Sequence, residues 1–530
     1  MKSRRLLLGI FVFAMSGCTL FGKKTLEIPT VDVETIKISL PTRPTRNEGA
    51  IKSADGFDYI DLYELSDFHG AVNYEPNHSN DVYIGLPKLA SYFDKKRSEN
   101  PGGTLILSTG DMFQGSADSN LTRGYMVNYC MQYMGFDAMA VGNHEFDWTD
   151  EWLKKNAELK YNTSTIPYLG ANILKNGQVP DYLSKSTIIS RKDYKIGVIG
   201  VIGSTLEDSI LKSAIENYEF VSYSSIVEQE ATRLKTEEHC NAVVLLAHDS
   251  ANSIESISNN TVDAVFGGHA HENIEASVGG VPALATKNYG QSVAHISLKF
   301  DSSTKTIVPE GTTSNIERMV NVHNTLSDDA NVKNIMSQYS TEVDKIKNIK
   351  LGKCTEDLAY DKALKNICTR AMYEAAVSSA DKNDEVDSSK IIAAYHNVNG
   401  GIRDDIAKGN ITYGSVYKAF PFDNEVVLIK VTGFEYIRNC ASLNRLGIYR
   451  TFESKSEIKE NETYYIVGTD FLAFSEYFSE FKKDEGGLQD KHLIRTGKIV
   501  REEVAQKIFS IKKVKNSEWG QNDTCYRVVS

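Results

Sequence analysis

Side chains that can bind metal ions gather at five points in the first half of the chain, each at or just after a short apolar run. The five stretches are LSDFHG with Asp67 and His69, STGDMFQG with Asp111, AVGNHEFD with Asn143, His144, Glu145 and Asp147, LLAHDS with His248, and FGGHAHE with His269 and His271. Taken singly, an HD pair after a strand is typical of a capping interaction, and a GD pair is typical of a turn. Several such strand ends in one chain indicate a shared site.

This set of imidazoles and carboxylates is large enough to hold two divalent ions about 3.5–4 Å apart, with one carboxylate bridging them through its two oxygens. Nitrogen and oxygen ligands with imidazole dominant suit zinc, manganese, iron or cobalt better than calcium or magnesium. Such an ion pair supplies hydroxide near neutral pH and screens the charge of a phosphate under attack. The residues therefore predict metal-assisted hydrolysis of a phosphate ester.

The elements that must position these residues alternate between strands and helices from Asp58 to about Phe300. Short apolar runs predict strands at DYIDLYEL, TLILSTG, DAMAVG, KIGVIGV, AVVLLAH and DAVFGGH. Between several of them, LPKLASYFDKKR and IVEQEATRLKTEEHC repeat apolar residues at three and four positions, which predicts helices. The alternation indicates a layered α/β domain, in which loops at the carboxyl ends of the strands usually carry the site.

A charged amphipathic stretch from Leu326 to Ile349 predicts one helix that connects this region to a second domain. Beyond Gly352, a helix is expected near Leu364 to Val377, with strands at KIIAAY, EVVLIKV and TYYIVG. We divide the chain into a signal peptide (1–17), a flexible tether (18–55), a metal-binding domain (56–322), a linker helix (323–350) and a second domain (351–530).

The N-terminus has the features of an export signal. MKSRRLLLGIFVFAMSGC has a basic start, an apolar run from Leu6 to Met15 that is too short to span a bilayer, and small residues before Cys18. Its end resembles a bacterial lipobox, so we expect a lipid on Cys18 that anchors the protein in the cell envelope, facing the periplasm or the exterior. The alternative is an ordinary signal peptide that contains a cysteine. The remaining cysteines show no disulfide framework.

The composition is that of a soluble globular protein with more than one domain. The 530 residues are 41% hydrophobic and 24% charged, with a formal net charge of −11. Because a nucleic acid backbone favours a basic protein face, we expect no nucleic acid polymer as a partner. A local metal site in an acidic protein can still bind a small phosphate compound.

The motifs DFHG, STGDMFQGS, MGFDAMAVGNHEFD, GANI and GGHAH, in this order, resemble the calcineurin-like metallophosphoesterase domain of 5′-nucleotidases. The resemblance covers roughly Tyr59 to Phe300. It implies an α/β fold in which a four-layer αββα-type metallophosphoesterase domain is joined by a helix to a smaller α/β C-terminal domain.

The same resemblance implies roles for the polar residues. The first metal ion would be held by Asp67, His69 and His271, and the second by Asn143, His248 and His269, with Asp111 as the bridge. His144 matches the family's catalytic histidine, which stabilises the phosphate charge and the leaving oxygen. Asp147 would orient His144, and Glu145 would support the site without binding metal.

The second half resembles the 5′-nucleotidase C-terminal domain, which supplies a nucleoside pocket. The match lies in NGGIRDDIAKGNITYGSVYKAFPFDNEVV, Asn399 to Val427. It implies substrate contacts from the metal ligand Asn143 and from Arg403, Phe422, Asn424 and Phe471, with the two phenylalanines on either side of the base. Together the two domains imply hydrolysis of nucleoside 5′-phosphates to nucleoside and phosphate outside the cytoplasm.

The C-terminal half departs from the family pattern in three places. Val398 stands where the family has asparagine, with Asn397 or Asn399 as substitutes. The family's upstream arginines that bind substrate have no clear match, because this chain offers Lys362 and Lys365 there. The family's GGDGY segment is missing after Phe471, so Phe474 or Tyr477 could take the place of Phe471 as the second stacking ring. Two other hypotheses therefore stay open. One is hydrolysis of a 2′,3′-cyclic nucleotide, a UDP-sugar or another small phosphoester, and the other is a non-catalytic binding lipoprotein.

Overall fold

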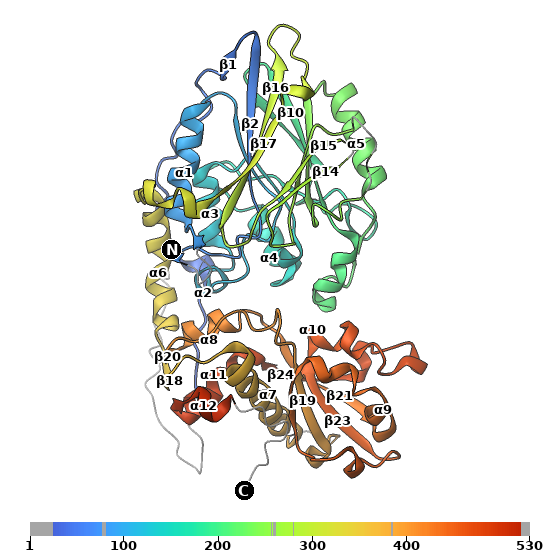
Figure 1. The fold of residues 1–530 in the computed structure, drawn as a ribbon. Helices are drawn as coiled ribbons and strands as arrows, with labels where there is room; N and C mark the ends of the chain where they lie inside the picture. Colours follow the sequence, from blue (N-terminus) through green and yellow to red (C-terminus); the bar gives the residue numbers. More distant parts are fainter. Residues whose placement is uncertain are drawn as a thin grey trace, which may run out of the picture.

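A computed structural model describes residues 25–76, 81–255, 257, 261–278, 280–382 and 385–520, which form two domains stacked end to end (Figure 1). Cys18 and the expected signal peptide lie outside the described residues, so the lipid anchor stays a prediction. None of the helices in the described ranges combines the length and apolarity needed to cross a membrane. The five cysteines within these ranges are free thiols.

The N-terminal domain is built on two β-sheets that pack face to face (Figure 1). The first sheet contains, in spatial order, β17 (Thr313–Arg318), β16 (Ser292–Asp301), β2 (Phe57–Leu65), β5 (Thr104–Ser108), β6 (Ala138–Ala140) and β7 (Tyr168–Leu169), with β1 (Ser53–Ala54) beside β2. The second contains β14 (Ile274–Val278), β15 (Val281–Ala285), β13 (Ala264–Gly267), β12 (Ala242–His248), β10 (Tyr194–Ile202) and β9 (Ser186–Arg191). Apolar side chains of both sheets, such as Leu62 and Leu246, form the core between them.

Helices cover the outer face of each sheet and complete four layers. The helices α1 (Leu86–Glu99) and α3 (Tyr125–Met134) share a hydrophobic core with the first sheet. On the second sheet, α5 (Ser224–Thr236) packs through the apolar side chains of Val227 and Leu234. The layered α/β fold expected from the alternating pattern is confirmed.

Parallel pairing of the central strands brings the polar residues to one edge of the domain. In the first sheet, β2 pairs in parallel with β5, and β5 pairs in parallel with β6. In the second sheet, β12 pairs in parallel with β13. Because parallel neighbours end at the same edge of a sheet, the loops that follow these five strands converge there.

The C-terminal domain is a smaller α/β unit (Figure 1). Its main sheet contains β22 (Gly447–Arg450), β19 (Ile391–His396), β23 (Thr463–Thr469), β21 (Glu425–Thr432) and β24 (Leu493–Ile499), and a smaller sheet contains β20 (Gly409–Thr412), β18 (Lys350–Cys354) and β25 (Lys513–Val514). The helices α7 (Lys365–Ala380) and α11 (Val500–Ile511) share a hydrophobic core with both sheets.

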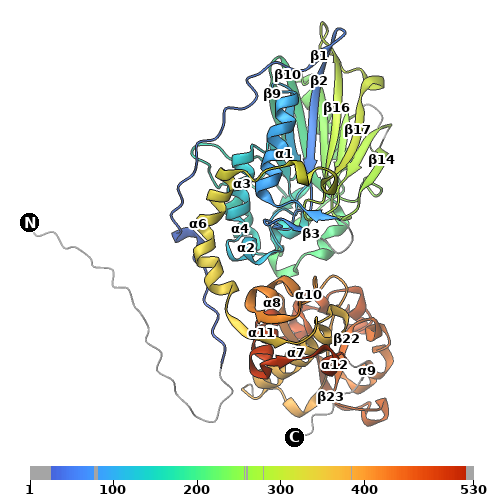
Figure 2. The same ribbon diagram turned by 60° about the vertical axis from the view of Figure 1, so that its left-hand side comes forward.

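The helix α6 (Ala330–Lys347) connects the two domains and lies within the linker helix expected over 323–350 (Figure 2). Its first turns pack through Ile335 and Tyr339 into the core of the N-terminal domain. At its other end, Ile346 belongs to the core of the C-terminal domain. The connector is therefore anchored in both domains.

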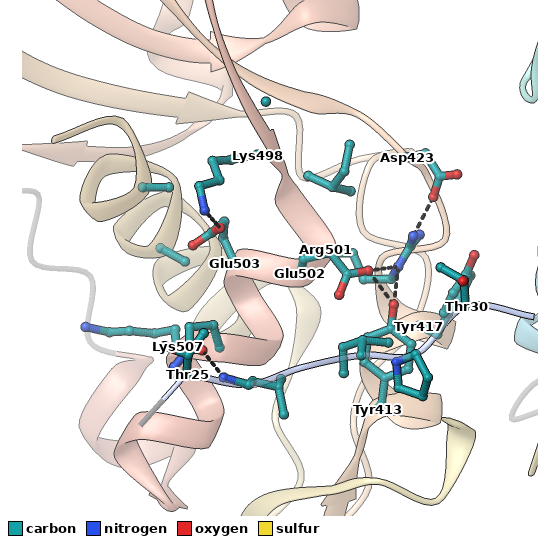
Figure 3. Close-up of a pocket in the computed structure, with 18 of the residues that line it drawn as sticks. Thr25, Thr30, Tyr413, Tyr417, Asp423, Lys498, Arg501, Glu502, Glu503 and Lys507 are labelled. Atoms are coloured by element: carbon teal, nitrogen blue, oxygen red, sulfur yellow. Dashed lines mark hydrogen bonds and ion pairs between the residues drawn. The ribbon is translucent and has the colours of Figure 1, made fainter. Parts of the chain in front are cut away.

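The segment before β1 runs beside α6 and along both domains (Figure 2). Leu26, Ile28 and Val31 pack against the core of the C-terminal domain, and the Leu26 N–H donates to Gln506 Oε1 at 2.6 Å. This part of the chain lines a cavity of about 980 Å³, whose wall comes mostly from the C-terminal domain. Figure 3 shows Thr25 and Thr30 of this segment in the wall together with Tyr413, Tyr417 and Lys507.

The next residues of the same segment bind the N-terminal domain. Val33 is buried in its core, and Ile36, Ile38 and Leu40 pack against that core. Burial of apolar surface stabilises such contacts by about 25 cal/mol per Å². From residue 25 onward, the structure thus differs from the flexible tether expected over 18–55, because the apolar side chains of this segment have surfaces on both domains to cover.

Candidate functional site

The candidate residues occupy loops directly after the converging strands. Asp67, His69 and Asp111 follow strands of the first sheet, His248 is the last residue of β12, and His269 follows β13. Three groups of side chains have ligand atoms within 4.8 Å of one another: Asp67, His69 and His271; Asp111, His248 and His269; and His69, Asp111 and His144. The structure therefore brings together all the histidines and aspartates predicted as metal ligands.

The backbone at the site is left-handed. The φ angles of Asp67, His69, Asp111, His269 and His271 are 49°, 47°, 53°, 66° and 56°, a region that non-glycine residues rarely adopt. Asp67 and His69, like His269 and His271, lie beyond the strands, since β2 ends at Leu65 and β13 at Gly267, so an extended backbone does not place either pair on one face. The side chains converge through tight loops, in which strained backbone is typical of functional sites.

Two histidines are held by backbone carbonyls in a defined orientation. His69 Nδ1 lies 2.8 Å from the Gln114 carbonyl oxygen, and His248 Nδ1 lies 2.8 Å from that of Thr109. A carbonyl oxygen can only accept, so each Nδ1 carries the proton. In the neutral ring this leaves the lone pair of Nε2 facing the cluster, which is how metal-binding imidazoles are usually fixed.

The atoms at the centre of the clusters fit a divalent cation. The Nε2 atoms of His69 and His271 face each other at 3.1 Å. Asp67 Oδ1 and Asp111 Oδ2 are buried and have no hydrogen-bond partner in the described part of the chain. Buried acceptors that point at one another without donors are costly unless a positive charge lies among them.

Asn143 belongs to the second cluster although its amide carries no charge. Its Oδ1 lies 3.1 Å from His248 Nε2 and 3.1 Å from His269 Nδ1. Asp111 Oδ2 lies 3.3 Å from the same His248 nitrogen. An amide oxygen, a carboxylate and two imidazoles around one point form an oxygen and nitrogen donor set of the kind that suits zinc, manganese or iron.

The electrostatics of the clusters also favour bound positive charge. Burial by itself raises the pKa of Asp111, but the imidazoles of His248 and His144 outweigh it and hold the pKa well below its usual range. Burial lowers the pKa of His69 to about 3, so this ring is neutral at pH 7 and its lone pair is available. For His248, Asp111 outweighs burial and raises the pKa to about 10. The carboxylates thus attract a cation to the site.

His144 lies on a short turn between the clusters and an adjoining cavity. Its Nδ1 lies 3.0 Å from Asp147 Oδ2, and its backbone N–H donates to Asp111 Oδ1 at 2.8 Å. Burial lowers the pKa of His144, but Asp147 and Asp111 outweigh burial and raise it to about 9. The ring therefore carries positive charge near neutral pH, with Nε2 left to face a ligand.

Glu145 lies behind the clusters and ties two loops together. Its carboxylate accepts the N–H groups of Asp111 at 2.8 Å, Met112 at 2.9 Å and Gly142 at 2.8 Å. It is absent from the three clusters of ligand atoms. These contacts fit a residue that supports the loops after β5 and β6 without binding metal.

Replacing Gly142 with alanine is expected to weaken metal binding by about 10-fold or more, as loss of support around a metal site does. A Cβ atom there would lie 2.3 Å from Asp111 Oδ1 and 2.8 Å from His248 Cε1, so both side chains would have to move. Metal titration of the purified variant measures the effect. Gly468→Ala is the matched control, since its Cβ would meet no atom closer than 3.7 Å. Equal affinities in the two variants would contradict the prediction.

A cavity of about 240 Å³, here called the first chamber, lies between the two domains at this site. The N-terminal domain contributes Asn143, His144, Asp147 and His269 to its wall, and the C-terminal domain contributes Arg403, Phe422, Asn424 and Phe471. The rings of His144 and Phe422 are stacked with centroids 5.9 Å apart. The predicted substrate contacts of both domains therefore share one cavity with the metal clusters.

The first chamber also distinguishes between the open alternatives in the C-terminal half. Asn397 lines it, with a buried Oδ1 that has no hydrogen-bond partner in the ranges described, whereas Asn399 is not part of the wall. Phe471 reaches the chamber from the start of α10 (Asp470–Ala473), while Phe474 and Tyr477 pack against a hydrophobic core instead. Phe471 thus keeps its expected place without a GGDGY segment.

Several residues of the site were not singled out from the sequence. Gln114 holds His69 through its carbonyl oxygen and also lines the first chamber, as do Trp148 and Leu211. Gln114 lies within STGDMFQG and Trp148 directly follows AVGNHEFD, so their places in the sequence next to predicted ligands could have indicated them. Leu211 belongs to a loop with no motif, and only the folded chain brings it to the chamber.

Comparison with known proteins agrees with this geometry. The chain matches the calcineurin-like phosphoesterase family over residues 62–273 and the 5′-nucleotidase C-terminal domain over residues 341–438. Calcineurin-like metallophosphoesterases use divalent metal ions, in agreement with the three clusters of candidate ligands.

Relatives and solved structures support the same assignment. The chain is 26% identical over 404 residues to endonuclease YhcR of Bacillus subtilis. The aligned region covers 70% of this chain and 32% of YhcR. It is 24% identical over 385 residues to 5′-nucleotidase of Mus musculus, and this aligned region covers 66% of this chain and 64% of the mouse protein. Its fold is similar to the 5′-nucleotidase precursor of Thermus thermophilus, with a TM-score of 0.69 and 18% identity, over 89% of this chain and 100% of that one. The chain belongs to the 5′-nucleotidase family of phosphoric ester hydrolases, with a calcineurin-like phosphoesterase domain followed by a 5′-nucleotidase C-terminal domain.

Proposed function

We propose that this protein is a metal-dependent 5′-nucleotidase that hydrolyses nucleoside 5′-phosphates to nucleoside and phosphate outside the cytoplasm, anchored to a membrane through Cys18. The observation that carries the reaction is the first chamber. It places His144 and the metal clusters of one domain against Phe422 and its neighbours in the other. A nucleotide has a part for each side: a phosphate for the metal clusters and His144, and a flat base for Phe422.

Two divalent ions of zinc, manganese, cobalt or iron fit the donor atoms. Asp67, His69 and His271 would hold the first, Asn143, His248 and His269 the second, and Asp111 would contact both. When bound, such a pair lowers the pKa of a bridging water and screens the phosphate charge.

The chain's own contribution to the reaction comes from two cationic side chains. His144 is held by Asp147 through Nδ1, so Nε2 can donate a hydrogen bond to a phosphate oxygen and stabilise charge that develops on the leaving oxygen. Arg403 lines the first chamber, with its guanidinium carbon 5.2 Å from the centre of the Phe422 ring. In the described part of the chain, Arg403 forms no ion pair with a carboxylate, so its charge is available to the substrate.

The base would bind on the far side of the chamber. Phe422 and Phe471 offer apolar faces to a planar ring, and the amides of Asn424 and Asn397 can hydrogen-bond to its edge. Stacking of a base on an aromatic side chain contributes about 1–3 kcal/mol. This contribution would favour nucleotides over phosphomonoesters without a base.

Replacing Phe422 with alanine is expected to raise the KM for AMP by about 10-fold, the loss of one stacking contact. The KM for glycerol phosphate, which has no base, should change much less. Steady-state kinetics of phosphate release from both substrates measures the difference. Phe434→Ala is the matched control, because Phe434 is 52% exposed and lies outside the chamber. An equal rise in KM for both substrates would contradict base stacking.

Phosphate release by the purified chain tests the function itself. AMP, glycerol phosphate and a 2′,3′-cyclic nucleotide should be compared with added manganese, cobalt or zinc, with chelator as the control. Metal-dependent turnover that favours AMP supports the proposal. Turnover of the cyclic nucleotide alone would replace it with a phosphodiesterase, and no turnover with metal bound would leave a binding lipoprotein.

A further inference from the structure

The loop of residues 420–424, here called the base loop, carries Phe422 into the first chamber. It joins α8 (Tyr413–Ala419) to β21. Four of its five residues line the chamber: Pro421, Phe422, Asp423 and Asn424. A loop presents a side chain in a fixed place only where other residues hold its backbone. The contacts that hold the base loop therefore bear on how a base binds.

Arg501, in the first turn of α11, holds the base loop from within the C-terminal domain. The residue is buried, with 5% of its surface exposed. Its Nη1 reaches three successive carbonyl oxygens, at 3.4 Å for Phe420, 3.3 Å for Pro421 and 3.2 Å for Phe422. Its Nη2 donates to the carboxylate of Asp423 (Figure 3). One side chain thus contacts four consecutive residues of the loop.

The position of Arg501 is unfavourable for a cation unless the base loop offsets the cost. A positive charge in the first turn of a helix opposes the helix dipole, and a buried charge loses its hydration. Asp423 supplies the opposite charge, and the guanidinium carbon lies 3.8 Å from the centre of the Tyr417 ring. Only the planar fork of arginine can serve the carbonyl oxygens and the carboxylate together, because the donors of lysine sit on one nitrogen.

The N-terminal domain holds the same loop from the opposite side. Arg123 Nη1 lies 3.2 Å from Asp423 Oδ2. Two amides donate to the Pro421 carbonyl oxygen, Asn120 at 3.0 Å and Gln114 at 3.4 Å. The base loop is therefore attached to both domains at once, although it belongs to the C-terminal domain.

Asp423 is the point at which the two attachments meet. Its Oδ1 accepts from Arg501 and its Oδ2 from Arg123, so each arginine has one oxygen. Burial raises the pKa of Asp423, but the two arginines outweigh burial and lower it, which keeps the carboxylate charged at neutral pH. Phe422 is the next residue in the chain, and its ring stacks on His144 of the other domain. Fixing Asp423 therefore fixes the distance between the base site and the metal clusters.

We propose that Arg501 and Arg123 are positioning residues for base recognition. They hold the base loop from the two domains and place Phe422 at the distance from the metal clusters that a nucleoside 5′-phosphate requires. Neither arginine lines the first chamber, so both act through the loop and not by contact with the substrate. The inference rests on the function proposed above and adds the residues that set its preference for a base.

The test compares Arg501→Lys and Arg123→Gln with the wild type, each as the full chain loaded with manganese. The quantity measured is the ratio of kcat/KM for AMP to that for glycerol phosphate, which has no base. Arg501→Lys should lower this ratio by about 10-fold, the loss of one stacking contact. Arg123→Gln should lower it by about 2–5-fold, as loss of a partly exposed ion pair does. An unchanged ratio in either variant overturns the role of that arginine.

The ratio separates positioning from folding. Loss of metal or a smaller folded fraction lowers the rate for both substrates and leaves the ratio unchanged. Arg123 is partly exposed, with 35% of its side chain accessible, so Arg123→Gln tests the same loop if Arg501→Lys does not fold. Arg370→Lys is the matched control, because Arg370 also pairs with a carboxylate, Glu374 at 2.7 Å, and lies outside the first chamber.

A double variant shows whether Arg501 acts through Phe422. Once Phe422 is replaced with alanine, no ring is left to position, so adding Arg501→Lys should leave the ratio at the value of Phe422→Ala alone. A further 10-fold fall would show that the two residues act independently and would overturn the inference. Failure of the wild type to hydrolyse AMP overturns the proposed function instead.

Discussion

Replacement of Asp111 with asparagine is expected to lower phosphate release by more than about 100-fold, the upper end of what loss of a supporting residue costs a metal site. Asp111 belongs to two of the three clusters. Its Oδ1 accepts the backbone N–H of His144 at 2.8 Å, and its Oδ2 lies 3.3 Å from His248 Nε2. The asparagine side chain has the same shape as that of aspartate, but it carries no negative charge. It also has one oxygen in place of the two carboxylate oxygens that make these contacts.

Metal content measured together with activity decides whether Asp111 acts in this way. The purified variant should contain less metal than the wild type after the same dialysis, and added metal should restore little activity. Asp328→Asn is a matched control, since Asp328 is a surface carboxylate paired with Lys333 at 3.2 Å. A variant of Asp111 that keeps its full metal content and activity would exclude a ligand role.

Replacement of His144 with alanine is expected to lower kcat by about 10²–10³-fold, as removal of a single charge-stabilising donor does in other enzymes. The imidazole is positively charged near neutral pH because Asp147 and Asp111 outweigh burial and raise its pKa to about 9. It faces the first chamber, and of the three clusters it belongs only to the one with His69 and Asp111, each of which also belongs to a cluster without His144. Metal content should therefore stay close to that of the wild type.

The kcat values of three variants, His144→Ala, Asp147→Asn and His492→Ala, show whether His144 acts in catalysis or only in folding. Asp147→Asn should lower kcat by less than His144→Ala, because the imidazole remains and loses only the partner that orients it. His492→Ala should keep wild-type kcat, since His492 pairs with Glu485 at 3.2 Å in the C-terminal domain, outside the first chamber. Loss of metal in His144→Ala would show that the residue acts on the clusters and not on the substrate.

The residue types of the site could be read from the sequence because each group follows a local signal. An apolar run predicts a strand, and polar residues at its end have few structural reasons to be there. His248 directly after AVVLLA and Asp111 after TLILSTG are examples, and both lie in the clusters. Repetition of this signal at several strands made the metal site predictable.

Other features depend on contacts between distant segments, which a local pattern does not encode. The stretch expected to be a tether shows no clear periodicity in the sequence, yet Ile36, Ile38 and Leu40 pack against the core of the N-terminal domain. Asn397 and Asn399 are equivalent in the sequence, and only the fold turns Asn397 toward the first chamber. The left-handed backbone at Asp67 lies in the loop after β2, at a position with no glycine to signal it in the sequence.

The sequence by itself thus determined the chemistry, the layered fold and the order of the two domains, since these depend on residue type and periodicity. Tertiary structure decided how the clusters divide and which rings face the first chamber. The rings of His144 and Phe422, which stack in this chamber, come from different domains. The shape of a cavity is set by packing between such distant elements, and no short stretch of sequence contains that information.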